Sequence, residues 1–216
     1  MNYILYGARR SGSLTVELAL AEIGASCDIR QVDLEGGTQR DDAYAAVNPQ
    51  RKIPTLITPA GETLTESVAI LLTLDERHPK ARLLPPAGSA ERAQALRWLL
   101  FVATEIYPMV EINDYPERFA PNSVSAAGVR EVARATWRER WLVVEHNIAG
   151  DPFLLQWGLC LSDIYIAVVS RWAQQDAWRP THIPKVERLT AAVAARPALA
   201  AVWSRHRPEA TPSRFD

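Results

Sequence analysis

The chain has 216 residues, and its 24 lysines and arginines nearly balance 25 acidic residues, which argues against a protein that binds nucleic acid or a membrane surface. Cys27 and Cys160 are its only cysteines and form no CxxC pair, which argues against a disulfide framework or a zinc site. The chain lacks both an apolar run of about 18 residues that could span a membrane and the basic start of a signal peptide, so we expect a cytoplasmic protein.

The first part of the chain has the pattern of a strand, a helix and a second strand. We expect short strands at residues 3–6 and 26–32. The helix between them begins near Ser11 or Ser13, either of which can cap it, and it ends at Gly24. A strand–helix–strand unit of about 30 residues brings its two strands together in parallel.

A hairpin and a helix follow this unit. A short helix is expected around residues 41–46, and two short apolar strands at 56–57 and 63–64 are joined by the turn sequence of residues 59–61. An apolar helix then begins at Glu66 and stops before His78 and Pro79. This order of elements is typical of a thioredoxin-like domain.

The chain changes character after a segment rich in proline and glycine, residues 79–88. Helical spacing dominates beyond it, over residues 91–112, 126–148, 162–177 and 184–203. We therefore predict a thioredoxin-like βαβ-ββα domain over residues 1–78, a linker over 79–88 and an all-helical domain over 89–216.

Two dipeptides in the first domain suggest a binding site. A cis bond between Ile53 and Pro54 would turn the polar backbone groups of Ile53 outward. Glu66 and Ser67 stand at a helix start, where N–H groups point at an anion. Each dipeptide alone more often marks only a strand start or a helix cap. Together they suit a small peptide that carries carboxylates.

The sequence from Asn48 to Leu56, followed by Thr65-Glu66-Ser67, resembles the cytosolic glutathione transferases. The resemblance covers nearly the whole chain, and residues 101–107 also resemble the first long helix of the bacterial beta class. It implies glutathione as a co-substrate, no metal, a small electrophile as the second substrate, and a homodimer.

The resemblance also implies roles for five residues in binding glutathione. The backbone of Ile53, which precedes the cis-proline Pro54, would pair with the cysteinyl part. Glu66 would bind the ammonium group and Ser67 the carboxylate of the γ-glutamyl end. Lys52 would approach the glycine carboxylate, although it also suits a solvated surface lysine.

Members of this family stabilise the glutathione thiolate with one hydrogen-bond donor after the first strand. A free thiol has a pKa of about 8.5, so little thiolate exists at neutral pH without such help. The candidates are Ser11, Ser13 and Tyr6, and Gly12 stands where the beta class has its cysteine. We favour Ser11, because Ser13 suits the helix N-cap and Tyr6 the strand core.

The electrophile pocket is expected between the two domains, with Tyr107 and Tyr115 as candidate lining residues, although both also suit ordinary packing. In the helical domain, Cys160 occupies the hydroxyl position of a capping box completed by Asp163, so we expect a weaker cap unless Ser162 replaces it.

We therefore predict an enzyme that conjugates the glutathione thiolate to small, mostly hydrophobic electrophiles, with Ser11 stabilising the thiolate. The alternatives are a glutathione-dependent peroxidase or reductase, and a non-catalytic glutathione-binding protein with the same fold. Fold alone does not choose among them.

Overall fold

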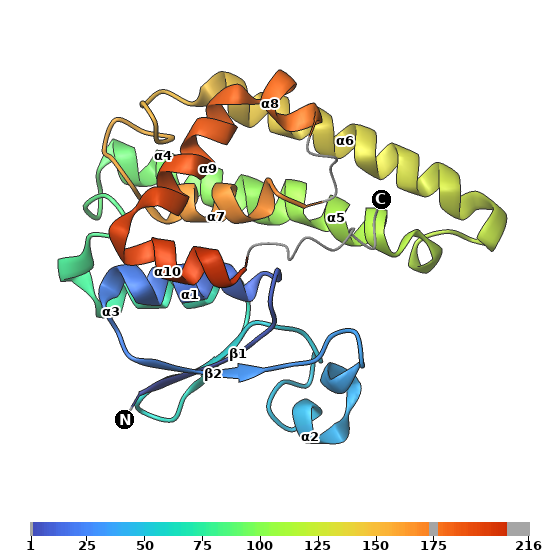
Figure 1. Ribbon diagram of the computed structural model, residues 1–216, viewed down its shortest axis with the longest axis horizontal. Helices are drawn as coiled ribbons and strands as arrows, with labels where there is room; N and C mark the ends of the chain where they lie inside the picture. The colour runs from blue at the N-terminus through green and yellow to red at the C-terminus, as the bar shows by residue number, and fades with distance from the viewer. Residues whose placement is uncertain (1, 173–176, 207–216) are drawn as a thin grey trace. The chain divides into compact units, whose positions relative to one another are not determined.

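The structure is a computed structural model that describes residues 2–172 and 177–206 (Figure 1). Its described residues form two compact units, one made of residues 2–84 with 194–206 and the other of residues 85–193. None of the described helices is long and apolar enough to cross a membrane.

A four-stranded mixed sheet forms the base of the first unit, in the order β2-β1-β3-β4. The strands are β1 (Tyr3–Gly7), β2 (Cys27–Gln31), β3 (Thr55–Ile57) and β4 (Thr63–Leu64). β1 and β2 run parallel because a helix connects them, whereas β3 pairs antiparallel with both β1 and β4. The predicted thioredoxin-like arrangement is confirmed.

Three helices belong with this sheet in the first unit: α1 (Ser13–Ile23), α3 (Ser67–Arg77) and α10 (Pro197–Arg205). α1 packs against β1, α3 and α10, and α10 lies along α1 on the side away from the sheet (Figure 1). Because α1 has neighbours on several sides, every residue from Ser13 to Leu20 is buried. Gly24 ends α1 in the left-handed conformation, with φ +73°, as predicted.

Short helical turns connect these elements of the first unit. They are η1 (Thr38–Arg40), α2 (Asp42–Ala45) and η2 (Pro79–Ala81). Of these, α2 carries Tyr44, a buried tyrosine whose hydroxyl lies 3.1 Å from that of Thr55 at the start of β3.

The second unit contains helices, turns and loops but no strand among its described residues. Its helices are α4 (Ala90–Phe101), the π-helical segment η3 (Val102–Ile106), α5 (Tyr107–Asp114), α6 (Ala126–Asn147), α7 (Leu161–Val169), α8 (Trp178–His182) and α9 (Pro184–Ala195), with short turns η4 (Pro116–Arg118) and η5 (Ser123–Ser125). All of α7 is buried, which makes it the centre of this core.

Prolines divide two of the predicted helices. The helix expected over residues 91–112 contains η3, and Pro108 follows that segment without an N–H to continue the regular bonding. The helix expected over residues 184–203 breaks at Arg196, whose backbone is extended (ψ 129°), because Pro197 disfavours the helical conformation before it. The helix expected over residues 162–177 ends earlier, at Val169; residues 173–176 lie outside the described chain.

The last helix belongs with the first unit, which differs from the predicted division of the chain. The whole of residues 89–216 was expected to form the helical domain, whereas residues 194–206 group with the sheet. The reason is packing: α10 lies on α1, and the Arg196 guanidinium forms a paired contact with the Glu22 carboxylate.

The capping box at the start of α7 forms with a thiol in place of a hydroxyl. The Cys160 side chain accepts the Asp163 N–H, and the Asp163 carboxylate accepts the Cys160 N–H at 2.8 Å. Ser162 does not take over, because its hydroxyl donates to the Ala95 carbonyl at 2.6 Å. Burial raises the pKa of Asp163 to about 6, although the N–H donors around it favour the charged form.

Candidate functional site

The strand register brings three connecting segments to one end of the sheet. Tyr6 lies opposite Thr55 in the antiparallel pair of β1 and β3, so the chain leaves β1 where it enters β3. Leu56 lies opposite Leu64, so the chain also leaves β4 for α3 at this end. The predicted site residues in these three segments are Ser11, Lys52, Ile53, Pro54, Glu66 and Ser67.

The segment before β3 is held by a cluster of polar side chains. The Ile53–Pro54 bond is cis, as predicted. The Lys52 carbonyl accepts hydrogen bonds from the Tyr44 hydroxyl at 2.8 Å and from the Asn48 amide at 2.7 Å. The Thr55 hydroxyl lies 3.1 Å from both of these side chains. We call Tyr44, Asn48 and Thr55 the carbonyl clasp, because they fix the backbone immediately before Ile53.

The clasp is buried and internally satisfied. Asn48 is 1% exposed, and its side-chain oxygen also accepts the Gln50 N–H at 3.0 Å. Burial raises the pKa of Tyr44, so its hydroxyl keeps the proton that it donates to Lys52. The Lys52 side chain itself is at an exposed position.

The segment before α3 has an unusual backbone conformation. Glu66 has φ +62° and ψ 111°, a backbone conformation that residues other than glycine adopt only at a cost in free energy. It is exposed, and its side chain does not cap the helix that begins at Ser67. The N-terminus of α3 therefore lies beside the Glu66 carboxylate and the Ser67 hydroxyl. The N–H groups at the start of a helix favour anions.

The segment after β1 holds two serine hydroxyls in contact. The Ser11 hydroxyl donates to the Ala8 carbonyl at 2.8 Å and accepts the Ser13 N–H at 3.2 Å. The two serine oxygens lie 2.9 Å apart, and the Ser13 oxygen accepts the Ala8 N–H at 3.2 Å. The expectation that Ser13 is the N-cap of α1 is wrong, because Gly12 occupies that position while the Ser13 side chain turns back to Ala8.

The two serines differ in how exposed they are to solvent. Ser13 is 0% exposed, whereas Ser11 is half-buried. A Cβ on Gly7 would come within 2.4 Å of the Ser13 hydroxyl, so glycine is needed there for this close packing. Tyr6 is half-buried in β1, with its ring edge-on to Tyr44 at 5.7 Å between centroids.

The two tyrosines predicted to line an electrophile pocket lie in the second unit. The half-buried Tyr107 packs against Trp172, with 4.9 Å between ring centroids. Tyr115 is 44% exposed, and the Arg118 guanidinium lies 3.9 Å above its ring. Over the residues described, no group of three or more His, Cys, Asp or Glu is placed to hold a metal ion.

Comparison with known proteins shows the family to which the chain belongs. A family model for the glutathione S-transferase N-terminal domain matches residues 5–85. The glutathione S-transferase GstA of an Escherichia coli strain is 30% identical over 74% of this chain and 77% of its own. The chain belongs to the cytosolic glutathione transferase superfamily.

Other glutathione transferase relatives extend the similarity to the full length. A Vibrio cholerae protein named "Probable maleylacetoacetate isomerase" is 30% identical over 97% of this chain and 99% of its own. A glutathione transferase homologue from Sulfitobacter, solved with bound glutathione, has a TM-score of 0.87 at 25% identity, covering 94% of this chain and 98% of its own.

Some residues that organise this candidate site escaped the sequence analysis. The Asn48-Pro49 pair is a local turn signal, and it could have indicated the clasp. Arg205 and His206, which contact the loop that carries Ser11, have no such signal, and neither has Glu17, which contacts both of them. Arg10 and His206 are 196 positions apart, and only folding brings them together.

Proposed function

We propose that the protein binds glutathione at this end of the sheet and transfers its thiolate to small, mostly hydrophobic electrophiles. The observation that carries the proposal is the strand register, which brings a cis-proline segment, a helix start and a serine-bearing loop to the same end of the sheet. These segments supply backbone hydrogen-bonding groups, charged groups and a hydroxyl, respectively, for a charged peptide that carries a thiol.

Glutathione would be held by backbone and charged groups. The backbone of Ile53 would pair with the cysteinyl residue, as an added strand pairs with a sheet edge. The Glu66 carboxylate would accept the ammonium group, and Ser67 with the start of α3 would bind the adjacent carboxylate. The Lys52 ammonium would meet the glycine carboxylate.

Ser11 would act on the sulfur by donating its hydroxyl proton to the thiolate. The Ser11 oxygen already accepts the Ser13 N–H, so its own hydroxyl proton is free to turn from the Ala8 carbonyl to the sulfur. When Ser11 turns away from the Ala8 carbonyl, Ser13 can donate there instead, because its oxygen lies 3.3 Å from that carbonyl. A hydrogen bond to the charged form lowers the pKa of the thiol and increases the thiolate fraction near pH 7.

The reaction then needs no further redox or metal chemistry. The thiolate electron pair forms a carbon–sulfur bond at the electrophilic carbon, and a leaving group departs with the displaced pair or the carbon skeleton takes up a proton. Tyr107 and Tyr115 are proposed to contact the electrophile on the strength of the family resemblance. Homodimerisation belongs to the same proposal, and light scattering during gel filtration tests it.

The test is the substitution Ser11→Ala with Ser13→Ala and Tyr6→Phe as matched controls. One lost hydrogen bond to a charged group should lower kcat/KM at neutral pH by about tenfold to a hundredfold. It should move the rise of activity to higher pH and leave binding to immobilised glutathione intact. An unchanged pH profile would exclude Ser11 from this role, and failure of the wild-type protein to bind glutathione would exclude the proposed function.

A glutathione-dependent isomerase is the second candidate, favoured by the full-length similarity to the Vibrio cholerae protein. A thiolate that adds to a conjugated double bond leaves a single bond that can rotate, and its expulsion restores the alkene and the glutathione. An assay that follows both substrates separates the two activities. A glutathione adduct indicates conjugation, glutathione disulfide indicates a peroxidase or reductase, and isomerised substrate at constant glutathione indicates isomerisation. Binding without any of these indicates a non-catalytic protein.

A further inference from the structure

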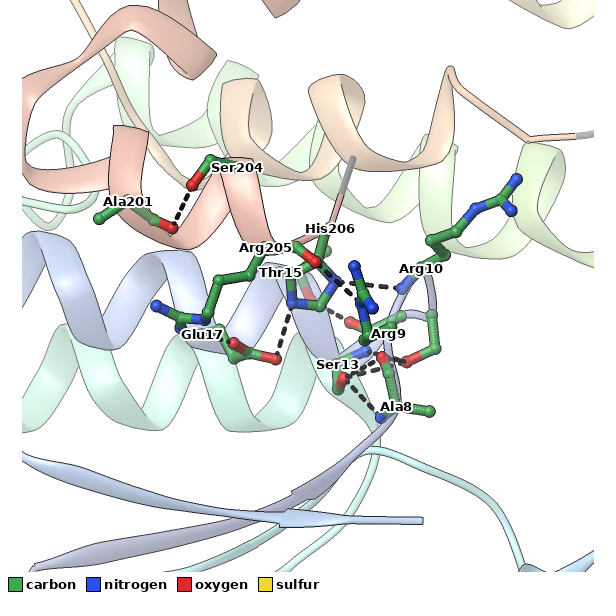
Figure 2. A network of polar contacts seen from close by, with 12 residues as sticks. Ala8, Arg9, Arg10, Ser13, Thr15, Glu17, Ala201, Ser204, Arg205 and His206 are labelled. Atoms are coloured by element: carbon green, nitrogen blue, oxygen red, sulfur yellow. Dashed lines mark hydrogen bonds and ion pairs between the residues drawn. The ribbon is translucent and has the colours of Figure 1, made fainter. Parts of the chain in front are cut away.

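The loop that carries Ser11 is attached to the C-terminal end of α10. The Arg10 N–H donates to Nδ1 of His206 at 3.0 Å, and the Arg9 guanidinium donates to the Arg205 carbonyl at 3.0 Å. Figure 2 shows both contacts, together with the Glu17 carboxylate on the other side of the imidazole. The loop is thus held from a helix that lies far away in the sequence.

The hydrogen bonds define which nitrogen of His206 carries the proton. A backbone N–H always donates, so Nδ1 accepts from Arg10 and carries no proton in this arrangement. Nε2 then carries the proton and donates to the Glu17 Oε1 atom, 3.1 Å away. The ring is held from both sides, and it is 3% exposed.

Glu17 orients this imidazole from the middle of α1. Its other oxygen, Oε2, lies 3.2 Å from the Arg205 guanidinium, so both carboxylate oxygens have partners. Its side chain is 4% exposed, as is that of His206. A buried carboxylate with two donors is a rigid support, because moving either donor would leave a buried carboxylate oxygen without its hydrogen bond.

The anchored residue lies immediately before Ser11. Arg10 has φ +60°, a left-handed backbone conformation that residues other than glycine rarely adopt unless surrounding contacts stabilise it. Within the described chain, the contacts that the structure gives the Ser11 hydroxyl are to Ala8 and Ser13 of the same segment. Those contacts close the turn, whereas the Arg10 amide and the Arg9 guanidinium connect it to the end of α10.

We propose that His206 is a positioning residue, whose Nδ1 holds the Arg10 amide and thereby sets where Ser11 presents its hydroxyl. The inference rests on the proposed role of Ser11 toward the glutathione sulfur. It adds the residue that follows α10 to a glutathione-binding site otherwise proposed from residues 11–67. Small displacements of a donor are costly, because a shift of about 1 Å can reduce a rate by about a hundredfold.

Two substitutions of His206 separate its two contacts. In His206→Asn the amide oxygen falls near the position of Nδ1 and can still accept the Arg10 N–H. In His206→Gln the amide falls near Nε2, so it keeps the contact with Glu17 and loses the one with Arg10. Both remove the ring, so each is the packing control for the other, and melting temperatures show that both variants fold.

The first readout is the pH profile of kcat/KM, measured with the KM for glutathione. His206→Gln should move the profile to higher pH in the direction of Ser11→Ala and leave that KM nearly unchanged, whereas His206→Asn should keep the wild-type profile. The inference is overturned if His206→Gln keeps the wild-type profile, or if both variants lose activity equally.

The second readout is hydrogen exchange of the Arg10 amide, which does not depend on activity. Losing its acceptor should make exchange about tenfold faster in His206→Gln than in His206→Asn. Equal exchange in the two variants overturns the anchor itself. If exchange differs as expected but Ser11→Ala has a wild-type pH profile, the proposed role of Ser11 fails and with it the positioning role, while the anchor remains. The two failures are therefore distinguishable.

Discussion

Two loops that leave the same end of the sheet are held in place in opposite ways. The loop before β3 is held by the carbonyl clasp, whose members lie 4 to 11 positions from their partners in the chain. The loop after β1 is attached to His206, 196 positions from its partner Arg10. The part proposed to bind glutathione is thus a local structure, whereas the part proposed to do chemistry depends on tertiary packing.

The difference follows from where each loop finds its hydrogen-bond partners. Closing a short loop costs little entropy, and Asn48 and Tyr44 can reach the Lys52 carbonyl as soon as their own segment folds. The Arg10 amide can reach its acceptor on His206 only after α10 has packed on α1. Perturbing one loop should therefore leave the other nearly unchanged, and the substitutions below test this independence.

The largest effect is expected from Asn48→Ala. It removes three hydrogen bonds from a buried position, one of them to the buried hydroxyl of Thr55. We expect a loss of about 3 kcal/mol in the free energy of unfolding, measured with urea, and weak retention on immobilised glutathione. Arg10 amide exchange should stay at the wild-type rate. A faster rate there would show that the two loops are coupled.

Glu66→Gly separates backbone strain from ligand binding. Glycine relieves the positive φ at this position, so stability should rise by about 1 kcal/mol after allowing for its extra chain entropy. Glutathione retention should fall, because the carboxylate proposed to accept the ammonium group is gone. Glu66→Gln keeps the backbone and loses only the charge, so it should weaken binding without the gain in stability. Wild-type retention by Glu66→Gly would exclude Glu66 as a contact.

The smallest effect on glutathione binding is expected from Tyr44→Phe. The substitution keeps the ring that packs against Tyr6 and removes only the hydroxyl that donates to the Lys52 carbonyl. Asn48 still donates to that carbonyl, so the loss should be about 1 kcal/mol in urea unfolding, with glutathione retention preserved. A loss as large as that of Asn48→Ala would mean that the clasp is held mainly by the tyrosine.

Local chemistry was sufficient to predict much of the first unit from the sequence. The alternation of strand and helix patterns gave the thioredoxin-like order, Gly24 ended α1 as its freedom at positive φ requires, and the Ile53–Pro54 bond is cis. Each of these features is decided by a few neighbouring residues. The break before Pro197 had the same kind of signal, which the helical spacing around it concealed.

The remaining features depend on contacts between distant segments. The orientation of Ser13 follows from its packing between Gly7 and Ala8 rather than from its place at a helix start. The place of α10 follows from its contacts with α1, and the partner of the Arg10 amide follows from that. The sequence by itself thus determined the fold and the segments expected to bind glutathione, because neighbouring residues decide those features. Only the tertiary structure decided how the loop around Ser11 is held, because the side chain that anchors it lies at the other end of the described chain.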